Sequence, residues 1–306
     1  MTIIADDAPR TPVAPPAGSG ARRTPTRPRR RLLSRRMLTA IGLSALLIPI
    51  SIGWIYPFLW MLGASFKTNE DVFDGLNIFT PVLHLENYAR AWQQANIGQY
   101  FLNTAVITVG SIIITVGTVA LMGYALGRYR FPGRKIIIGV LAAAVFLPEG
   151  YTIIPVVDLL QTLHLADSLL GLTLASSGGA HIISLLLFAG YFAQLPDELE
   201  EAATLDGASF VRIFWRIYLP LARPVTATAI ILQFMAAWND FLLPLVMTLS
   251  KPELRTLSVG IYALQGEYGT DWSALAAASV ISLLPITLLF LFLQRYFVEG
   301  IAGAVK

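Results

Sequence analysis

Two carboxylates interrupt stretches of the chain that are otherwise apolar. Glu149 lies in the sequence Pro148-Glu149-Gly150, and Asp240 directly follows Trp238 and Asn239. A charged side chain costs about 2.5–3.5 kcal/mol at the centre of a lipid-embedded helix, so such residues tend to face a polar path or the interior of a helix bundle. Glu149, Trp238, Asn239 and Asp240 are therefore candidates for lining a path for a polar solute. Hydrogen bonding to neighbouring helices is the alternative interpretation.

The chain lacks the motifs of covalent and nucleotide chemistry. It contains no G-x-x-x-x-G-K-[ST] phosphate loop, no G-x-G-x-x-G and no G-x-S-x-G nucleophile motif. Cysteine is absent, and the three histidines, His84, His164 and His181, have no metal-ligand spacing. We therefore expect no catalytic residue, no cofactor, no metal site and no nucleic-acid partner.

The most strongly patterned polar segment runs from residue 195 to 224. Pro196 is followed by four carboxylates between Asp197 and Glu201, which suit the positive end of a helix. Gly207 predicts the end of that helix and a sharp reversal, because glycine adopts positive φ without steric cost. A second, amphipathic helix is predicted from Ser209. From the residues alone, a hairpin resting on lipid and a hairpin that contacts a partner are equally favoured.

The elements that carry these residues are predicted from composition and hydropathy. Of the 306 residues, 55% are apolar and 13% are charged, and the mean hydropathy is +0.64. A soluble domain has about 25% charged residues, so a soluble enzyme and a disordered regulator are excluded. We predict an all-α membrane protein with six transmembrane helices and the amphipathic hairpin between the fourth and the fifth. The predicted spans are Met37–Gly63, Tyr100–Gly127, Ile136–Val157, Leu169–Ala193, Val225–Leu249 and Trp272–Leu293.

Residues 1–36 are predicted to be a disordered tail, and residues 37–306 the transmembrane domain. The tail holds six prolines between Pro9 and Pro28 and eight arginines between Arg22 and Arg36. With the tail inside, all but four of the 22 Lys and Arg residues lie on the inner side of the predicted spans. The positive-inside rule therefore places both termini in the cytoplasm.

Small residues on two predicted spans indicate close helix–helix contacts. Gly123 and Gly127 form a small-xxx-small pair on the second span, and Ala274, Ala277 and Ala278 form a small face on the sixth. Small side chains let helix backbones approach one another in a bilayer. We expect packing roles for both groups.

The patterned segment also carries a recognisable signature. Glu201-Ala202-Ala203, then Gly207, then Ile217 and Leu219-Pro220 reproduce the EAA signature of permease subunits from bacterial ABC importers. The chain resembles that family, and its MalG-like carbohydrate-uptake branch, over nearly all of residues 38–306. Further motifs similar to that branch are Asn103-Thr104, the junction from Tyr124 through Arg128 to Gly133, Trp238 to Pro244, and Gln294 to Lys306.

The resemblance implies a type I ABC importer permease in the inner membrane of a bacterium. Such a subunit forms half of a translocation pathway and has no enzymatic activity of its own. A second permease completes a heterodimeric pore, a cytoplasmic ATP-binding-cassette ATPase dimer hydrolyses ATP, and an extracytoplasmic sugar-binding protein delivers the solute. The EAA segment is implied to be the coupling helix that contacts the ATPase, through Glu201, Ala202, Ala203, Asp206 and Gly207.

A sugar would suit the candidate path residues. Carboxylate and amide groups at Glu149, Asn239 and Asp240 can accept hydrogen bonds from hydroxyls, and the ring of Trp238 can cover the apolar side of a pyranose. A polyol or glycerol phosphate is an alternative substrate within the same class. The alternative from another class is a self-contained, ion-coupled secondary transporter that uses Glu149 or Asp240 as its proton-coupling carboxylate, and a membrane enzyme is a distant third.

Overall fold

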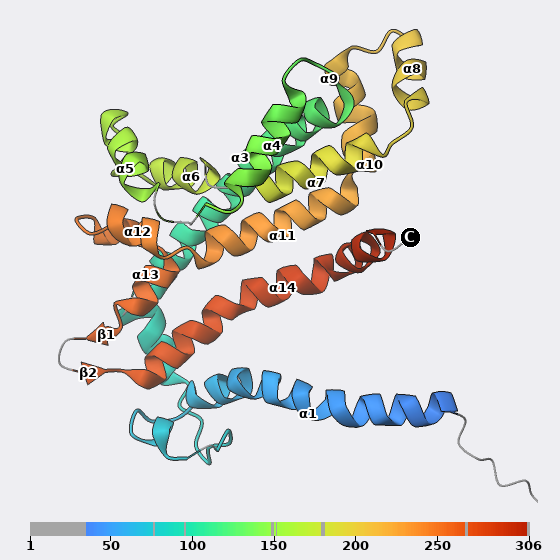
Figure 1. Ribbon diagram of the computed structural model, residues 1–306. Coiled ribbons are helices and arrows are strands. Elements are labelled where there is room, and N and C mark those ends of the chain that lie inside the picture. Colours follow the sequence, from blue (N-terminus) through green and yellow to red (C-terminus); the bar gives the residue numbers. More distant parts are fainter. Residues whose placement is uncertain are drawn as a thin grey trace, which may run out of the picture. The chain divides into compact units, whose positions relative to one another are not determined.

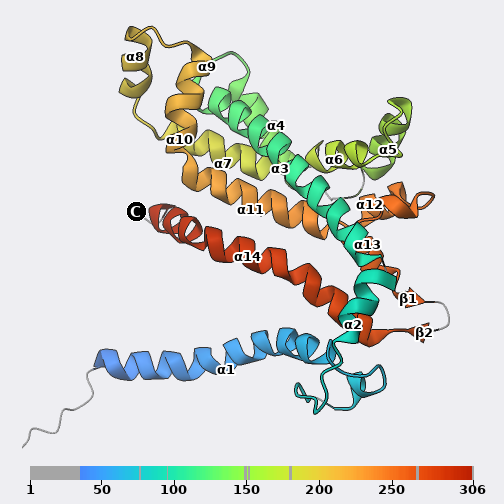
Figure 2. The ribbon, with the colours of Figure 1, turned by 180° about the vertical axis from the view of Figure 1, so that it is seen from behind.

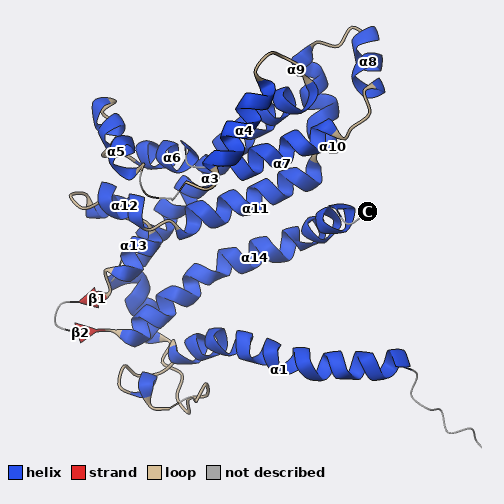
Figure 3. Cartoon of the chain, in the orientation of Figure 1, coloured by secondary structure: helices blue, strands red, loops and turns tan. Residues whose placement is uncertain are grey.

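The computed structural model describes residues 35–75, 77–94, 96–147, 150, 152–178, 181–266 and 269–304. The chain divides into two compact units, residues 1–54 and 55–306. The predicted tail lies outside the described residues, except that Arg35 and Arg36 begin the first helix. Nearly all of the described secondary structure is helical (Figure 3).

The elements follow one another along the chain in the order given in Figure 1. Helix α1 passes from the first unit into the second, and η2 and η3 are single π-helical turns. The bounds are α1 Arg35–Ala64, η1 Asp71–Phe73, α2 Glu86–Ala89, η2 Arg90–Gln94, α3 Ile97–Arg128, α4 Arg134–Ala144, α5 Ile153–Thr162, α6 Leu169–Gly178, α7 Ile182–Ala193, α8 Glu198–Leu205, α9 Phe210–Ile213, η3 Phe214–Tyr218, α10 Leu219–Leu221, α11 Arg223–Asn239, α12 Leu242–Met247, η4 Pro252–Leu254, α13 Leu257–Tyr262, β1 Gln265–Gly266, β2 Gly269–Thr270 and α14 Trp272–Ala304.

Three helices in the described part of the chain are long and apolar enough to cross a bilayer. They comprise Thr39–Ala64 of α1, all of α3 and Trp272–Gln294 of α14, and they correspond to the first, second and sixth predicted spans. Two bent helix pairs raise the number to five if each pair is counted as one span. One pair is α6 and α7, bent by 55°, and the other is residues 210–221 with α11, bent by 81°. The count of six spans stays a prediction.

The third predicted span contains two helices in the structure, with a break between them. Helix α4 ends at Ala144 and α5 begins at Ile153. Gly150, between them, has φ +98°, in the region that glycine occupies most easily. Pro155 lies in the first turn of α5, where its missing N–H leaves no helical hydrogen bond unmade. Hydropathy alone did not reveal this break, because the sequence on both sides of it is apolar.

The fifth predicted span is also interrupted. Helix α11 ends at Asn239, the backbone at Asp240 is extended with ψ 130°, and α12 begins at Leu242. Pro244 explains the break, because proline has no N–H to bond the carbonyl four residues earlier and its ring clashes with that carbonyl. The carbonyl concerned is that of Asp240.

Helix α3 is the central element of the second unit, and it packs along α6, α7 and α11 (Figures 1 and 2). Its small residues allow the close approach to α7 that the sequence predicts. A Cβ added at Gly123 would lie 2.4 Å from the Cβ of Phe188, and one added at Gly127 would lie 2.7 Å from the carbonyl oxygen of Ala189. The alanine face of α14 is confirmed too, since Ala274, Ala277 and Ala278 are buried in one cluster with residues of α3 and α11.

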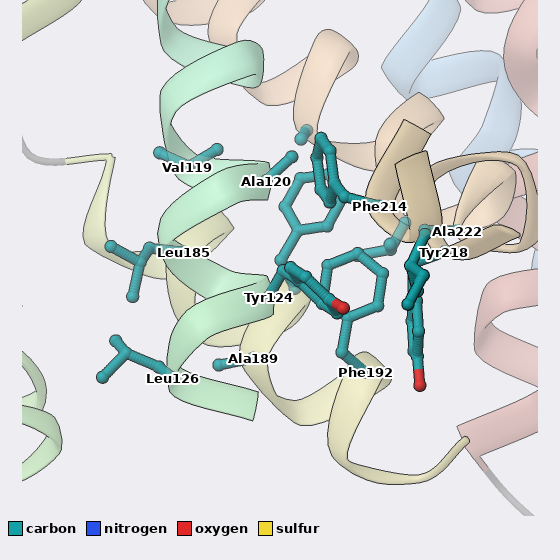
Figure 4. Packing of buried hydrophobic residues seen from close by; sticks show 14 of the residues in the cluster. Val119, Ala120, Tyr124, Leu126, Leu185, Ala189, Phe192, Phe214, Tyr218 and Ala222 are labelled. Carbon is teal, nitrogen blue, oxygen red and sulfur yellow. The ribbon is translucent and has the colours of Figure 1, made fainter. Parts of the chain in front are cut away.

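An aromatic cluster fills the space where α3 meets α7, α9 and η3. Tyr124 of α3 is fully buried, and its ring centroid lies 4.7 Å from that of Tyr218 and 5.4 Å from that of Phe214. Figure 4 shows Tyr124, Phe192, Phe214 and Tyr218 converging between these helices. The cluster joins the end of α3 to the segment that leads into α11.

The opposite end of α3 holds the segment before α13. The side-chain amide of Asn103 donates hydrogen bonds to the carbonyls of Glu253 and Arg255, at 2.8 and 2.9 Å. The N–H of Leu257 donates to the hydroxyl of Thr104, at 2.7 Å. Both Asn103 and Thr104 are buried, so the Asn-Thr pair noted in the sequence is a structural support for this segment. The short antiparallel hairpin of β1 and β2 follows α13.

We predict that Gly123→Ala lowers the stability of the protein by about 1–3 kcal/mol, because the added methyl group overpacks the contact with α7. The measurement is the Tm in detergent micelles. Gly117→Ala is the matched control, since Gly117 lies in the same helix and has nothing within 4 Å of the added Cβ. An unchanged Tm for Gly123→Ala would show that α3 and α7 are not in close contact.

Candidate functional site

Helix α8 carries the residues that the sequence singles out in its patterned segment. Glu201, Ala202, Asp206 and Gly207 are exposed, whereas Ala203 is buried. Ala203 packs into the aromatic cluster around Tyr124, so it attaches the helix to the core. Figures 1 and 2 show α8 beside α9 at one end of the second unit, and the β1–β2 hairpin at the other.

Gly207 ends α8 in a defined hydrogen-bonded turn. Its φ is +75°, its N–H donates to the carbonyl of Thr204 at 3.0 Å, and the N–H of Ala208 donates to the carbonyl of Ala203 at 2.9 Å. This pair of bonds is the Schellman motif, which favours glycine at the left-handed position. The turn leaves Ser209 as the N-cap of α9.

Leu205 belongs to the exposed part of α8, which the sequence reasoning missed. Its side chain is 89% exposed, four residues after Glu201 and therefore on the same side of the helix. The sequence pattern singled out the carboxylates, the alanines and Gly207 of this segment, and it gave no role to Leu205. We call one group of exposed residues on this helix and its turn the α8 edge; they are Glu201, Ala202, Leu205, Asp206 and Gly207.

One arginine fixes the beginning of α8 to the end of α3. The side chain of Arg128 is only 6% exposed. Its Nη2 lies 2.6 Å from Oδ1 of Asp197, its Nε lies 3.2 Å from Oε2 of Glu200, and its Nη1 donates to the carbonyl of Leu195 at 2.9 Å. A buried guanidinium needs such partners, because an unpaired charge is costly to remove from water. These contacts set the position of the first turn of α8.

Two tyrosines complete the surroundings of Glu200. The hydroxyl of Tyr129 donates to Oε1 at 2.7 Å, and the hydroxyl of Tyr218 donates to Oε2 at 3.3 Å. Burial raises the pKa of Tyr129, so its hydroxyl stays protonated and remains a donor at neutral pH. The sequence reasoning placed Arg128 in a family motif and Glu200 at a helix end, but it did not pair them.

The candidate path residues lie at the far end of α11, apart from α8. Trp238 is buried, its Nε1 donates to the carbonyl of Ser282 at 3.1 Å, and its ring stacks on that of Phe234 with centroids 5.2 Å apart. Asn239 is exposed, and its amide donates to the carbonyl of Met235 at 2.9 Å.

Asp240 lies directly at the break between α11 and α12 and is partly exposed. The structure therefore brings Trp238, Asn239 and Asp240 together, while Glu149 lies outside the described residues. Trp238 has a packing role between α11, α3 and α14, because its indole is covered by protein. Its predicted stacking against a sugar stays a prediction.

Comparison with known proteins gives consistent matches. Residues 119–303 match the family described as the binding-protein-dependent transport system inner membrane component. The chain is 35% identical to the diacetylchitobiose uptake system permease NgcG of Streptomyces coelicolor, over 89% of both chains. It is 34% identical to the probable starch degradation products permease AmyC of Thermoanaerobacterium thermosulfurigenes, over 90% of this chain and 98% of the relative.

A third relative is the arabinooligosaccharides transport permease AraQ of Bacillus subtilis, 32% identical over 87% of this chain and 95% of that protein. Among solved structures, the fold is similar to a chain of a bacterial ABC transporter involved in the import of the acidic polysaccharide alginate. The TM-score is 0.73 with 24% identity, and the match covers 87% of this chain and 99% of that chain. At that identity the likeness describes the fold.

We predict that Gly207→Ala loosens the turn after α8, since a Cβ in the left-handed region costs about 1–2 kcal/mol. The expected result is amide hydrogen exchange that is about tenfold faster at Ala208, because about 1.4 kcal/mol corresponds to a factor of ten. Gly139→Ala is the control, since that helical glycine has open space around the added Cβ. Equal exchange at Ala208 in both variants would contradict the left-handed turn.

Proposed function

The chain belongs to the family of binding-protein-dependent transport system inner membrane components, and from this membership we propose that it forms half of the translocation pathway of an ATP-driven importer of oligosaccharides. The observation that carries the proposal is identity of 32–35% over most of the chain to permeases whose names specify diacetylchitobiose, starch degradation products and arabinooligosaccharides. A polyol or glycerol phosphate is the alternative substrate.

Membership in this family favours ATP-driven transport over ion-coupled transport. The chain carries no nucleotide-binding motif, so ATP hydrolysis falls to a partner, an ATP-binding-cassette ATPase dimer on the cytoplasmic side. The carboxylates Glu149 and Asp240, which a secondary transporter would use for proton coupling, have no such role in this proposal and are assigned to the solute path.

The α8 edge is the surface that docks on the ATPase. It combines one apolar side chain, Leu205, with two carboxylates and with small residues that let another backbone approach closely. Interfaces of this kind place an apolar anchor among polar groups at the rim. The burial of Ala203 also supports the proposal. Ala203 packs into the buried cluster around Tyr124, so the side of α8 that carries the α8 edge faces away from the core.

The topology that fits this function has six membrane spans and both termini in the cytoplasm. Arg128 ends α3 and contacts α8, and Arg130 and Arg134 follow it; the positive-inside rule places this basic end in the cytoplasm. On that assignment Asn103, at the other end of α3, lies toward the outer surface together with η4 and α13. Residues 1–36 remain the predicted cytoplasmic tail.

The solute path runs past the break at Asp240. An interrupted helix is tolerated in a bilayer where it borders a cavity or is covered by protein, and the partly exposed Asp240 and exposed Asn239 stand at such a break. We place Glu149 and Trp238 near the same path, as the sequence suggests. A second permease subunit closes the path from the other side, and an extracytoplasmic sugar-binding protein delivers the solute.

Reconstitution of the complete transporter tests this function. The chain is purified with its partner permease and ATPase, placed in proteoliposomes, and supplied with the sugar-binding protein and a panel of labelled oligosaccharides, polyols and glycerol phosphate. We expect uptake of an oligosaccharide that requires ATP and persists when ionophores remove the ion gradients. The measurement is label accumulated inside the vesicles.

Two results would contradict the proposal. One is accumulation of solute by this chain alone, driven by a proton or sodium gradient without ATP. The other is ATP-driven uptake of a polyol or glycerol phosphate but of no oligosaccharide in the panel, which would keep the mechanism and change the substrate. Proteoliposomes that contain the ATPase without this chain are the control.

We predict that Asp240→Asn raises the oligosaccharide concentration for half-maximal uptake by about tenfold, because hydrogen bonds to a charged group contribute about 1.5–3 kcal/mol. The expected cause is a weaker interaction between the solute's hydroxyls and the neutral amide. Asp158→Asn on α5 is the control, since Asp158 is an exposed carboxylate on a different helix. Identical uptake kinetics in the Asp240→Asn protein would remove this residue from the path.

A further inference from the structure

Adjacent carboxylates on α8 face in different directions. Successive residues of an α-helix are separated by about 100° around its axis, so neighbours in sequence point to different surroundings. The side chain of Glu200 is 21% exposed and contacts Arg128, whereas Glu201 is exposed on the α8 edge. The two residues have the same chemistry but different partners, which makes separate roles testable.

Arg128 holds α8 in a fixed direction. Its guanidinium uses three different nitrogens, on Asp197, Glu200 and the carbonyl of Leu195. A guanidinium is planar and its donors point in fixed directions, so several simultaneous partners define orientation as well as distance. The apolar contact of Ala203 has no comparable directionality. Tilting of α8 about its first turn is therefore resisted mainly by Arg128.

Glu200 contacts two different elements at once. Its carboxylate meets Arg128 and Tyr129 at the end of α3, and it also accepts a hydrogen bond from Tyr218 in η3. Tyr218 is fully buried, packs on Tyr124 of α3, and lies under Arg128 with the guanidinium carbon 5.3 Å from the ring centroid. Through α10, η3 leads into α11, which ends at Asn239, directly before Asp240.

We propose that Arg128 and Glu200 form the joint that passes movement of α8 to α3 and α11, while Glu201 serves contact with the ATPase. This inference rests on the proposed function, since it assigns the mechanical step between ATP hydrolysis and the solute path. Arg128 and Glu200 are positioning residues, because they act through α8 and touch neither ATP nor solute. Displacement of the α8 edge then moves both spans together only while this joint is intact.

The test compares Glu200→Gln with Glu201→Gln in the reconstituted complete transporter. For Glu200→Gln we expect retained association with the ATPase and a ratio of sugar transported to ATP hydrolysed that falls about fivefold or more, as for loss of a typical coupling free energy. For Glu201→Gln we expect weaker association with the ATPase. Arg128→Lys should reproduce the effect of Glu200→Gln, since an ammonium keeps the charge but loses the planar arrangement of donors.

A second measurement follows the distance between α3 and α8, and it does not depend on transport. The natural chain has no cysteine, so Met122→Cys on α3 and Glu198→Cys on α8, both exposed positions, give a clean spin-labelled pair. In the assembled transporter we expect the distance between the two spin labels to have one narrow distribution, both with and without trapped ATP. With Glu200→Gln added, the distribution should broaden when ATP is trapped.

The outcomes separate this inference from the proposed function. An unaltered transport-to-hydrolysis ratio in Glu200→Gln, together with a distance distribution as narrow as that of the parent, would overturn the joint. Loss of ATPase association in Glu200→Gln equal to that in Glu201→Gln would also overturn it, because the two carboxylates would then share one role. Failure of the unmodified transporter to use ATP would instead contradict the proposed function.

Discussion

The buried charge of Arg128 is the constraint on which the arrangement of α8 depends. A guanidinium that is almost withdrawn from solvent has to be surrounded by acceptors, and here the acceptors come from the first turn of α8 and the chain just before it. Once Glu200 is turned inward to meet it, the helical repeat turns Glu201 outward. The exposed α8 edge is thus a consequence of a contact on the opposite side of the helix.

Glycine and proline determine where the remaining helices stop. Gly207 ends α8 through its left-handed backbone, and Pro244 interrupts the fifth predicted span at Asp240. Helix α3, which has no proline, runs unbroken past the interrupted helices on either side of it. Since its backbone hydrogen bonds are continuous, α3 can move as one rigid element.

Local signals were sufficient for part of this structure. The stop at Gly207 and the close packing at Gly123 follow from residue type and spacing, and the sequence predicted both. The pairing of Arg128 with Glu200 joins positions 72 residues apart, and four carboxylates stand near that helix start, so no local rule selects the partner. Hydropathy gives the apolar length of the third span but not the break near Gly150, because hydropathy measures side chains and the break lies in the backbone.

The contacts of Asn103 and Thr104 have a consequence for how deep the neighbouring segment can lie. The carbonyls of Glu253 and Arg255 accept hydrogen bonds from α3, and the N–H of Leu257 donates one to α3, so these groups need no solvent. Irregular backbone survives below the lipid headgroups only when its polar groups are satisfied by protein. These backbone groups can therefore lie below the headgroups of a bilayer, where those of an ordinary connecting loop would need water.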